Sequence, residues 1–410
     1  MARLLLPARI SQYRSSLLGA LRACLSARGD TRPDSDLAGL SGLAFRLQAD
    51  ARISPASVSA FPWSVELPGA LSRLGYSSAC IFADPMVDPR FAQLAAAAVV
   101  QITEALQSEP PPILWGVHLP EFGFAHGVDS ARRELIVAGV LSGRGASDRL
   151  PFDRLGRSDV PLLFALTPGD FDPAPPREAI LAALAHAARL LGGEGARFDG
   201  FALGLAAYEV WRDALTSGRI DPSGHAYHVQ VVCELRQLAP AFLERAAMIV
   251  DEAAAPDVRA AAAACQRAAA ALLELAAAWP FPIPDGASLT SSSAARHATL
   301  LGIAATAEAE ALARIERALE SSRRAVIRAE LRIVEASAAD AELLFRCVVD
   351  LPIGGLDHEV ATLTTTIAPK LGAMPGALLL RSDVIRKRIA GVAPEQRLPE
   401  SCYTPEWTER

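Results

Sequence analysis

The stretch Ser15–Ser–Leu–Leu–Gly–Ala–Leu–Arg22 opens the first strong structural pattern of the chain. Leucines recur at three- and four-residue spacing through residues 15–28, and Gly29 follows them. This spacing predicts a helix with one apolar face that ends at the glycine. Outward from it, residues 1–170 combine helical and strand patterns. We therefore predict an α/β front domain over this range.

Short apolar segments between turn residues predict the strands of the front domain. They lie at residues 44–47, 78–82, 113–118, 122–128, 134–141 and 162–166. Helical periodicity predicts helices at residues 34–40, 67–74 and 88–107. Only a short turn separates the segments 122–128 and 134–141, so we expect these two strands to pair antiparallel.

The pattern changes at Pro176, after which long alanine-rich helices follow one another and strand signals are absent. The expected helices cover residues 178–191, 203–217, 224–253, 256–278 and 294–335. We predict a helical domain over 171–347, whose charged last helix is suited to face solvent or a protein partner. Residues 348–410 return to a strand–helix pattern and predict a partial parallel α/β fragment.

Composition excludes several classes of function. The chain has 410 residues and a formal net charge of -6, which argues against a nucleic-acid partner. Its only lysines are Lys370 and Lys387, so a lysine-dependent phosphate loop or Schiff-base enzyme is excluded from most of the chain. Six scattered cysteines without a C-x-x-C pair predict neither a zinc site nor a disulfide framework. We expect a cytoplasmic protein without a membrane span, metal or cofactor.

Several stretches of the first two thirds carry a family resemblance. They are Ser15–Ser–Leu–Leu–Gly–Ala–Leu–Arg22, Leu40–Ser–Gly–Leu–Ala–Phe–Arg46, Ser54–Pro–Ala–Ser57, Ile113–Leu–Trp–Gly116, Pro120–Glu–Phe–Gly123, Gly127–Val–Asp129, Leu150–Pro–Phe–Asp–Arg–Leu–Gly156, Gly204–Leu–Ala–Ala–Tyr–Glu209 and Ala226–Tyr227. In this order they resemble the butirosin biosynthesis protein H-like N-terminal domain, a relative of the C39 papain-like cysteine peptidases. The resemblance covers roughly residues 10–280 and implies that the front domain is papain-like and α+β.

The resemblance also implies a catalytic arrangement. In that family a cysteine at a helix start attacks a carbonyl group, and a histidine before a strand is its base. The matching positions here are Ser16 and Glu121, and Asp129 matches the aspartate of a Gly-x-Asp turn. Since the expected cysteine and histidine are both replaced, acyl transfer or hydrolysis is expected to be impaired.

Other residues offer alternative pairs. Cys24 lies two helical turns after Ser16, on the same face, and His118 and His126 flank the strand that follows Glu121. The pairs Cys24/His126 and Ser16/His118 are therefore alternative nucleophile–base pairs, while a buried core thiol is the simpler interpretation of the cysteine.

A further pair, His225 and His228, has helical spacing for a metal, but Glu234 lies off that helix face and no third ligand completes a site. The sequence therefore predicts no metal site in this helix.

The last segment carries a second resemblance. The stretches Ala368–Pro–Lys–Leu–Gly372, Pro375–Gly–Ala–Leu–Leu–Leu–Arg–Ser–Asp–Val–Ile–Arg–Lys–Arg388, Gly391–Val–Ala–Pro394 and Tyr403–Thr–Pro405 are similar to the P-loop kinase-like half of bifunctional aminoglycoside phosphotransferase/ATP-binding proteins. The resemblance implies that Asp383 orients the acceptor hydroxyl and Arg386 holds substrate or phosphate. Where the phosphate loop belongs, residues 354–362 contain acidic side chains and no lysine, which predicts a degenerate P-loop and a truncated fragment.

Three hypotheses for function follow. The first is a catalytically impaired cysteine-peptidase-like or acyltransferase-like protein that binds a small molecule, a peptide or an acyl group, free or on a carrier. The second is a relative of small-molecule kinases or ATPases that has lost its phosphate loop. The third is a non-enzymatic module whose helical region contacts a protein partner.

Overall fold

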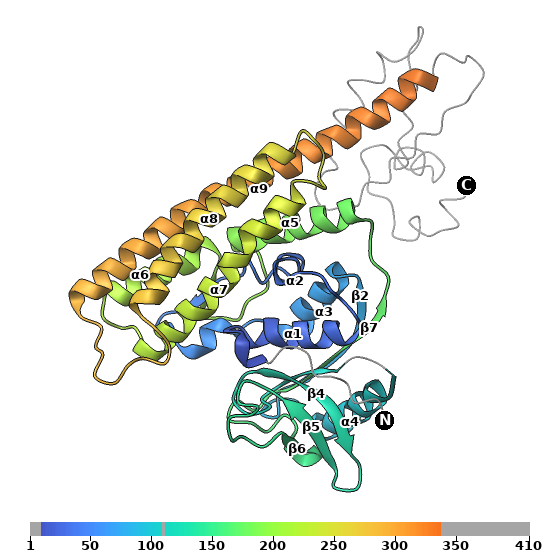
Figure 1. Ribbon diagram of the computed structural model, residues 1–410, viewed down its shortest axis with the longest axis vertical. Helices are drawn as coiled ribbons and strands as arrows, with labels where there is room; N and C mark the ends of the chain where they lie inside the picture. The colour runs from blue at the N-terminus through green and yellow to red at the C-terminus, as the bar shows by residue number, and fades with distance from the viewer. Residues whose placement is uncertain (1–9, 109–110, 338–410) are drawn as a thin grey trace, which may run out of the picture. The chain divides into compact units, whose positions relative to one another are not determined.

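The computed structural model describes residues 10–108 and 111–337 (Figure 1). The chain divides into two units, residues 1–323 and 324–410. Of the second unit only the helical backbone up to Ser337 is described. The predicted fragment 348–410, with Asp383 and Arg386, lies outside the described residues. The described part mixes helices with antiparallel sheets and belongs to the general α+β class.

The first unit contains a six-stranded antiparallel sheet. Its strand order is β2-β7-β3-β4-β5-β6, with bounds β2 Tyr76–Ala83, β3 Ile113–Trp115, β4 Phe122–Asp129, β5 Glu134–Ala138, β6 Arg149–Pro151 and β7 Leu163–Phe171. The predicted antiparallel pair is confirmed as β4 and β5, with Asp129 opposite Glu134.

Side-chain alternation along the strands buries both faces of this sheet. On one face Trp115 and Phe122 join the core of α1 (Ser16–Ala27) and α3 (Trp63–Arg73). On the other face Leu114 and Val137 pack with α4 (Phe91–Ser108). The predicted helix that begins beside Ser15 is thus confirmed, and one of its neighbours is β4.

Further helices follow β7 along the chain, and the last of them continues past residue 323, where the first unit ends. They are α5 Pro176–Gly192, α6 Leu205–Thr216, α7 Pro222–Ala246, α8 Ala255–Ala278 and α9 Ser291–Ser337. The helices α1, α2 (Asp34–Ser41) and α3 lie between the sheet and these later helices, and α7 packs against both α2 and α8 (Figure 1).

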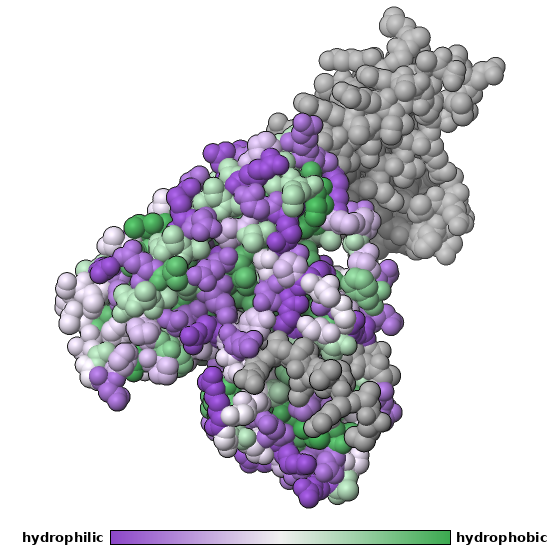
Figure 2. Space-filling view, viewed as in Figure 1, coloured by the Kyte–Doolittle hydropathy of each residue, from purple (hydrophilic) through white to green (hydrophobic). Residues whose placement is uncertain are grey.

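Helix α8 is the one described helix that is long and apolar enough to cross a membrane. One side of this helix, which includes Leu272 and Leu275, is buried against the neighbouring helices, whereas Leu273 is exposed. Over α7 and α8 the visible surface mixes hydrophilic and hydrophobic residues (Figure 2). A core helix that is mostly buried meets the same criteria of length and apolar composition as a membrane span.

One strand prediction was wrong, and short strands were missed. Residues 44–47 form no strand, because the guanidinium group of Arg236 donates to the carbonyl oxygens of Ala44, Phe45 and Arg46 at 2.9–3.2 Å. The strand β1 begins at Gln48 instead, and Gln48–Asp50 pairs antiparallel with β8, Phe201–Leu203. The sequence pattern missed β6 and β8, each of which has three residues, too few to show a periodicity.

Candidate functional site

The start of α1 is held by a carboxylate from a distant helix. Glu234 of α7 accepts hydrogen bonds from the backbone N–H groups of Arg14 and Ser15, at 2.9 and 2.7 Å. The Ser15 hydroxyl caps the helix by accepting from the backbone N–H of Leu18 at 3.3 Å. These bonds fix Ser16 as the first residue of the helix.

Ser16 meets Glu121, the residue directly before β4. The Oγ atom of Ser16 donates to Oε2 of Glu121 at 2.5 Å and accepts from the backbone N–H of Phe122 at 3.2 Å. The other carboxylate oxygen, Oε1, accepts from the hydroxyl of Tyr227 in α7. Three segments that lie about one hundred residues apart in the chain therefore meet at one carboxylate. We call the three residues the Ser16–Glu121–Tyr227 cluster.

Burial dominates the electrostatics of this cluster. It raises the pKa of Glu121, and the two hydroxyl donors oppose that rise because they stabilise the charged form. Burial together with the negative carboxylate raises the pKa of Tyr227 well above its usual value. Tyr227 thus remains a neutral donor at every physiological pH, and Glu121 is the group of this cluster that titrates.

A large cavity of about 560 Å³ borders the cluster at Glu121 and Tyr227. Its wall is mostly apolar and aromatic, and includes Trp63, Trp115, Leu119, Val140, Leu141, Val160, Leu162, Phe198 and Phe281. The indole N–H groups of Trp63 and Trp115 donate to the backbone carbonyls of Ser59 and Val160. The two indoles therefore contribute ring surface to the cavity rather than hydrogen-bond donors.

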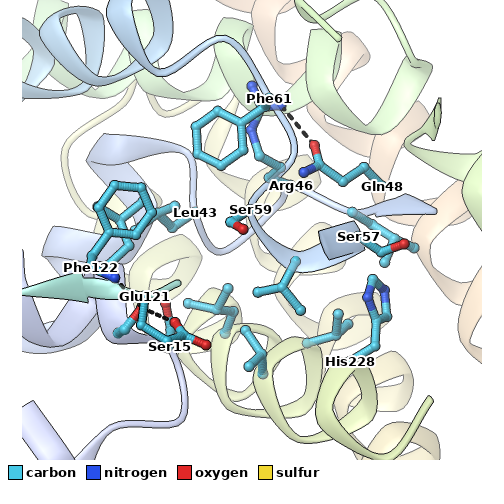
Figure 3. Close-up of a pocket in the computed structure, with 17 residues that line it drawn as sticks. Ser15, Leu43, Arg46, Gln48, Ser57, Ser59, Phe61, Glu121, Phe122 and His228 are labelled. Atoms are coloured by element: carbon cyan, nitrogen blue, oxygen red, sulfur yellow. Dashed lines mark hydrogen bonds between the residues drawn. The ribbon is translucent and has the colours of Figure 1, made fainter. Parts of the chain in front are cut away.

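A second cavity, of about 40 Å³, is lined by Ser16 and Glu121 among other residues (Figure 3). Apolar side chains line its middle, while Gln48, Ser57 and His228 lie at the end away from Glu121 in this view. Both ring nitrogens of His228 and the amide nitrogen of Gln48 are buried without a protein partner. A cavity of this size holds a few water molecules that can bond to these groups.

The alternative nucleophile–base pairs are not brought together at this site. Cys24 is 0% exposed in the core, where burial raises the pKa of its thiol. His118 directs Nε2 to the carbonyl oxygen of Ser147 at 3.1 Å. His126, half-buried in β4, packs near the ring of Phe124, and burial lowers its pKa. Of the candidate residues of the front domain, only Ser16 and Glu121 share a hydrogen bond.

Asp129 stabilises the turn between β4 and β5. Its carboxylate accepts from the backbone N–H of Arg132 at 3.1 Å and from Arg149 at 3.2 Å, and these contacts lower its pKa. It lines neither described cavity. The turn-forming role that the Gly-x-Asp match implies is therefore the one that its contacts support.

The two histidines of α7, His225 and His228, both contact the ring of Trp211 in the core, and His225 also reaches a histidine of α9. Nε2 of His225 lies 3.1 Å from Nδ1 of His297, and Nδ1 of His225 accepts from the indole N–H of Trp211 at 3.0 Å. No group of three or more His, Cys, Asp or Glu side chains within the described ranges could hold a metal ion.

Sequence reasoning missed the roles of Tyr227 and Glu234 at the site. In the sequence Tyr227 stands out only as part of the stretch Ala226–Tyr227 of the first resemblance, and Glu234 only as a carboxylate that lies off the helix face of His225 and His228. A scan against protein-family models finds no match for this chain, and a search of the curated proteins finds none either. The function is therefore argued from the geometry of the site.

Proposed function

We propose that this chain is a ligand-binding relative of papain-like cysteine peptidases, similar to the butirosin biosynthesis protein H-like domain, with impaired acyl chemistry. Ser16 and Glu121 stand where that resemblance expects a nucleophile and its base, and the 560 Å³ cavity receives the ligand. The observation that carries the proposal is the 2.5 Å hydrogen bond between the two side chains. A small molecule, a peptide or an acyl group fits a cavity of this kind.

The chemistry of the pair explains why binding is favoured over catalysis. A serine hydroxyl needs a base that takes its proton during attack, and histidine is suited to this because its pKa lies near neutrality. A glutamate has a reference pKa of about 4.3, and it is a weak base even after burial has raised that value. Since His118 and His126 have other contacts, the hydroxyl of Ser16 lacks an imidazole partner.

The size and lining of the larger cavity support binding. Protein sites for small molecules measure about 300–1,000 Å³ and are mostly apolar with a few polar groups. This cavity falls within that range and presents the Glu121 carboxylate and the Tyr227 hydroxyl on a largely aromatic wall. An apolar ligand body is thus expected to pack against the aromatic side chains.

The proposed ancestry is tested by restoring the cysteine and the histidine. In the double variant Ser16→Cys/Glu121→His the new thiol and imidazole are expected to form an ion pair that lowers the thiol pKa below the free value of about 8.5. The rate of iodoacetamide alkylation is measured against pH by mass spectrometry of the peptide that carries residue 16. The single variant Ser16→Cys is the control, and its thiol beside Glu121 is expected to titrate above that value.

If the double variant titrates like the single variant, the two positions do not form a peptidase-like pair and the proposed ancestry is wrong. Ligand binding is tested independently with Ala60→Phe, because Ala60 lines the larger cavity and a phenyl group there would fill part of it. A ligand that occupies the cavity should lose most of its affinity in this variant.

A further inference from the structure

Glu121 is a partly buried carboxylate without a countercharge. Two hydroxyl groups donate to its oxygens. Within the described ranges no arginine, lysine or histidine pairs with it, and the causes of its pKa shift include no charged neighbour. A buried charge normally has an opposite charge beside it, because hydroxyl groups alone replace only part of the lost hydration. The missing countercharge is the observation from which the ligand class follows.

The cavity beside this carboxylate has the composition of a cation site. Trp63, Trp115 and Tyr227 line it together with Glu121. Aromatic rings attract cations through the negative potential of their faces, and tryptophan does so most strongly. The hydroxyls of Ser16 and Tyr227 already donate to the carboxylate, so the remaining oxygen lone pairs of the cluster accept hydrogen bonds. The cluster therefore fits a ligand group that is positively charged and donates hydrogen bonds.

Two arginines on the cavity wall leave this conclusion unchanged. Arg14 and Arg144 are exposed to solvent, where water and salt screen their charges. Arg46, which lines the smaller cavity, has its own counterion in Glu66 at 2.8 Å. None of the three supplies the countercharge of Glu121.

We infer that the ligand of the 560 Å³ cavity is an amine cation with an apolar body, whose ammonium group binds the Glu121 carboxylate between aromatic rings. The inference rests on the proposed ligand-binding function and specifies the class of ligand. In this role the glutamate at the position expected for a histidine base is a recognition group rather than a catalyst. Large exposed apolar residues that also line the cavity, such as Phe198 and Phe281, contact the apolar body.

The experiment compares three probes of similar size and different charge, with the full chain at pH 8. Isothermal titration calorimetry measures the affinity of 2-phenylethylamine, 2-phenylethanol and 3-phenylpropionate. The amine is expected to bind at least about tenfold more tightly than the alcohol, because it alone brings a positive charge to the Glu121 carboxylate and forms an ion pair with it. The anion is expected to bind more weakly than the alcohol.

The variant Glu121→Gln removes the charge and keeps the shape of the side chain. It should abolish the preference for the amine and leave the affinity of the alcohol within about twofold. The matched control is Glu244→Gln, an exposed residue of α7, which should retain the preference. The wild-type comparison of the three probes decides the charge preference even if Glu121→Gln fails to fold.

The outcomes separate the inference from the proposal on which it rests. If the amine is not preferred, or if its preference survives in Glu121→Gln, the inference is wrong. The ligand-binding function then still stands, provided that the alcohol binds and that Ala60→Phe abolishes its binding. If none of the three probes binds at millimolar concentration, both the inference and the ligand-binding function fail.

Discussion

Nε2 of His225 lies 3.1 Å from Nδ1 of His297, in the core between α7 and α9. Because Nδ1 of His225 accepts the indole proton of Trp211, its own proton is on Nε2, which therefore donates to His297. This fixes a neutral tautomer for His225 and a direction for the chain of hydrogen bonds. Burial lowers the pKa of both histidines, and that of His225 well below its usual value.

Acid is expected to destabilise the fold through its buried histidines. Burial lowers the pKa of His228 to about 3, whereas an unfolded histidine titrates near 6.5. The unfolded chain therefore binds more protons than the folded chain below that pH. The stability that the neutral His228 contributes is complete above pH 6.5 and is lost as the pH falls toward 3, at about 1.4 kcal/mol per pH unit.

The variant His228→Leu isolates this effect. Both ring nitrogens of His228 lack protein partners, so leucine should change the free energy of unfolding at pH 7.5 by less than about 1 kcal/mol. Between pH 6 and pH 4 the variant should lose less stability than the wild type, by about 1.4 kcal/mol per pH unit. Urea unfolding at several pH values measures both quantities. Parallel pH profiles for the two proteins would contradict the prediction.

The pair Arg236–Glu308 is expected to be essential for folding stability. Arg236 donates to Glu308 at 2.5 Å, and both side chains are almost fully buried. The variant Glu308→Gln leaves the arginine charge without its partner, which should cost about 3–5 kcal/mol of unfolding free energy. Denaturant unfolding measures this loss. In the exposed pair Arg267–Glu310, the matched variant Glu310→Gln should cost less than about 1 kcal/mol.

Removal of the Tyr227 hydroxyl is expected to destabilise the protein in a pH-dependent way. The variant Tyr227→Phe takes one hydrogen-bond donor from Glu121 and should raise the pKa of that carboxyl further. The loss should be about 1–3 kcal/mol at pH 8, where Glu121 is ionised. It should be smaller at pH 5, because the raised pKa of Glu121 brings the carboxyl closer to its neutral form as the pH falls, and a neutral carboxyl depends less on the missing donor. Unfolding free energies at the two pH values test this, and an equal loss at both would argue against a charged Glu121.

Cys24 is expected to be chemically inert in the native protein. Its side chain is 0% exposed, and burial raises the pKa of its thiol. Since alkylation requires an accessible thiolate, modification of Cys24 should proceed only as fast as the protein unfolds. Mass spectrometry after iodoacetamide treatment, with and without urea, measures the rate. Rapid labelling under native conditions would contradict this prediction and make Cys24 and His126 a candidate nucleophile–base pair again.

The helices and strands whose apolar residues recur with a clear period were predictable from the sequence. Leucine spacing indicated α1, and alternation with a short turn indicated the pair β4 and β5. Both depend on residues close to one another in the chain, so local pattern is sufficient. Residues 44–47 were misassigned because a remote arginine, Arg236, binds their carbonyl groups. No local pattern can reveal that contact.

For the site, the sequence by itself singled out Ser16 and Glu121, as the residues that its resemblance to the papain-like family would place at the nucleophile and base positions. Only the tertiary structure decided that they bind one another and that Tyr227 completes the cluster beside a large cavity. The physical reason is that the charge state and partners of Glu121 depend on burial and on groups about one hundred residues away. Both of these are produced by packing, and neither is encoded in the spacing of neighbouring residues.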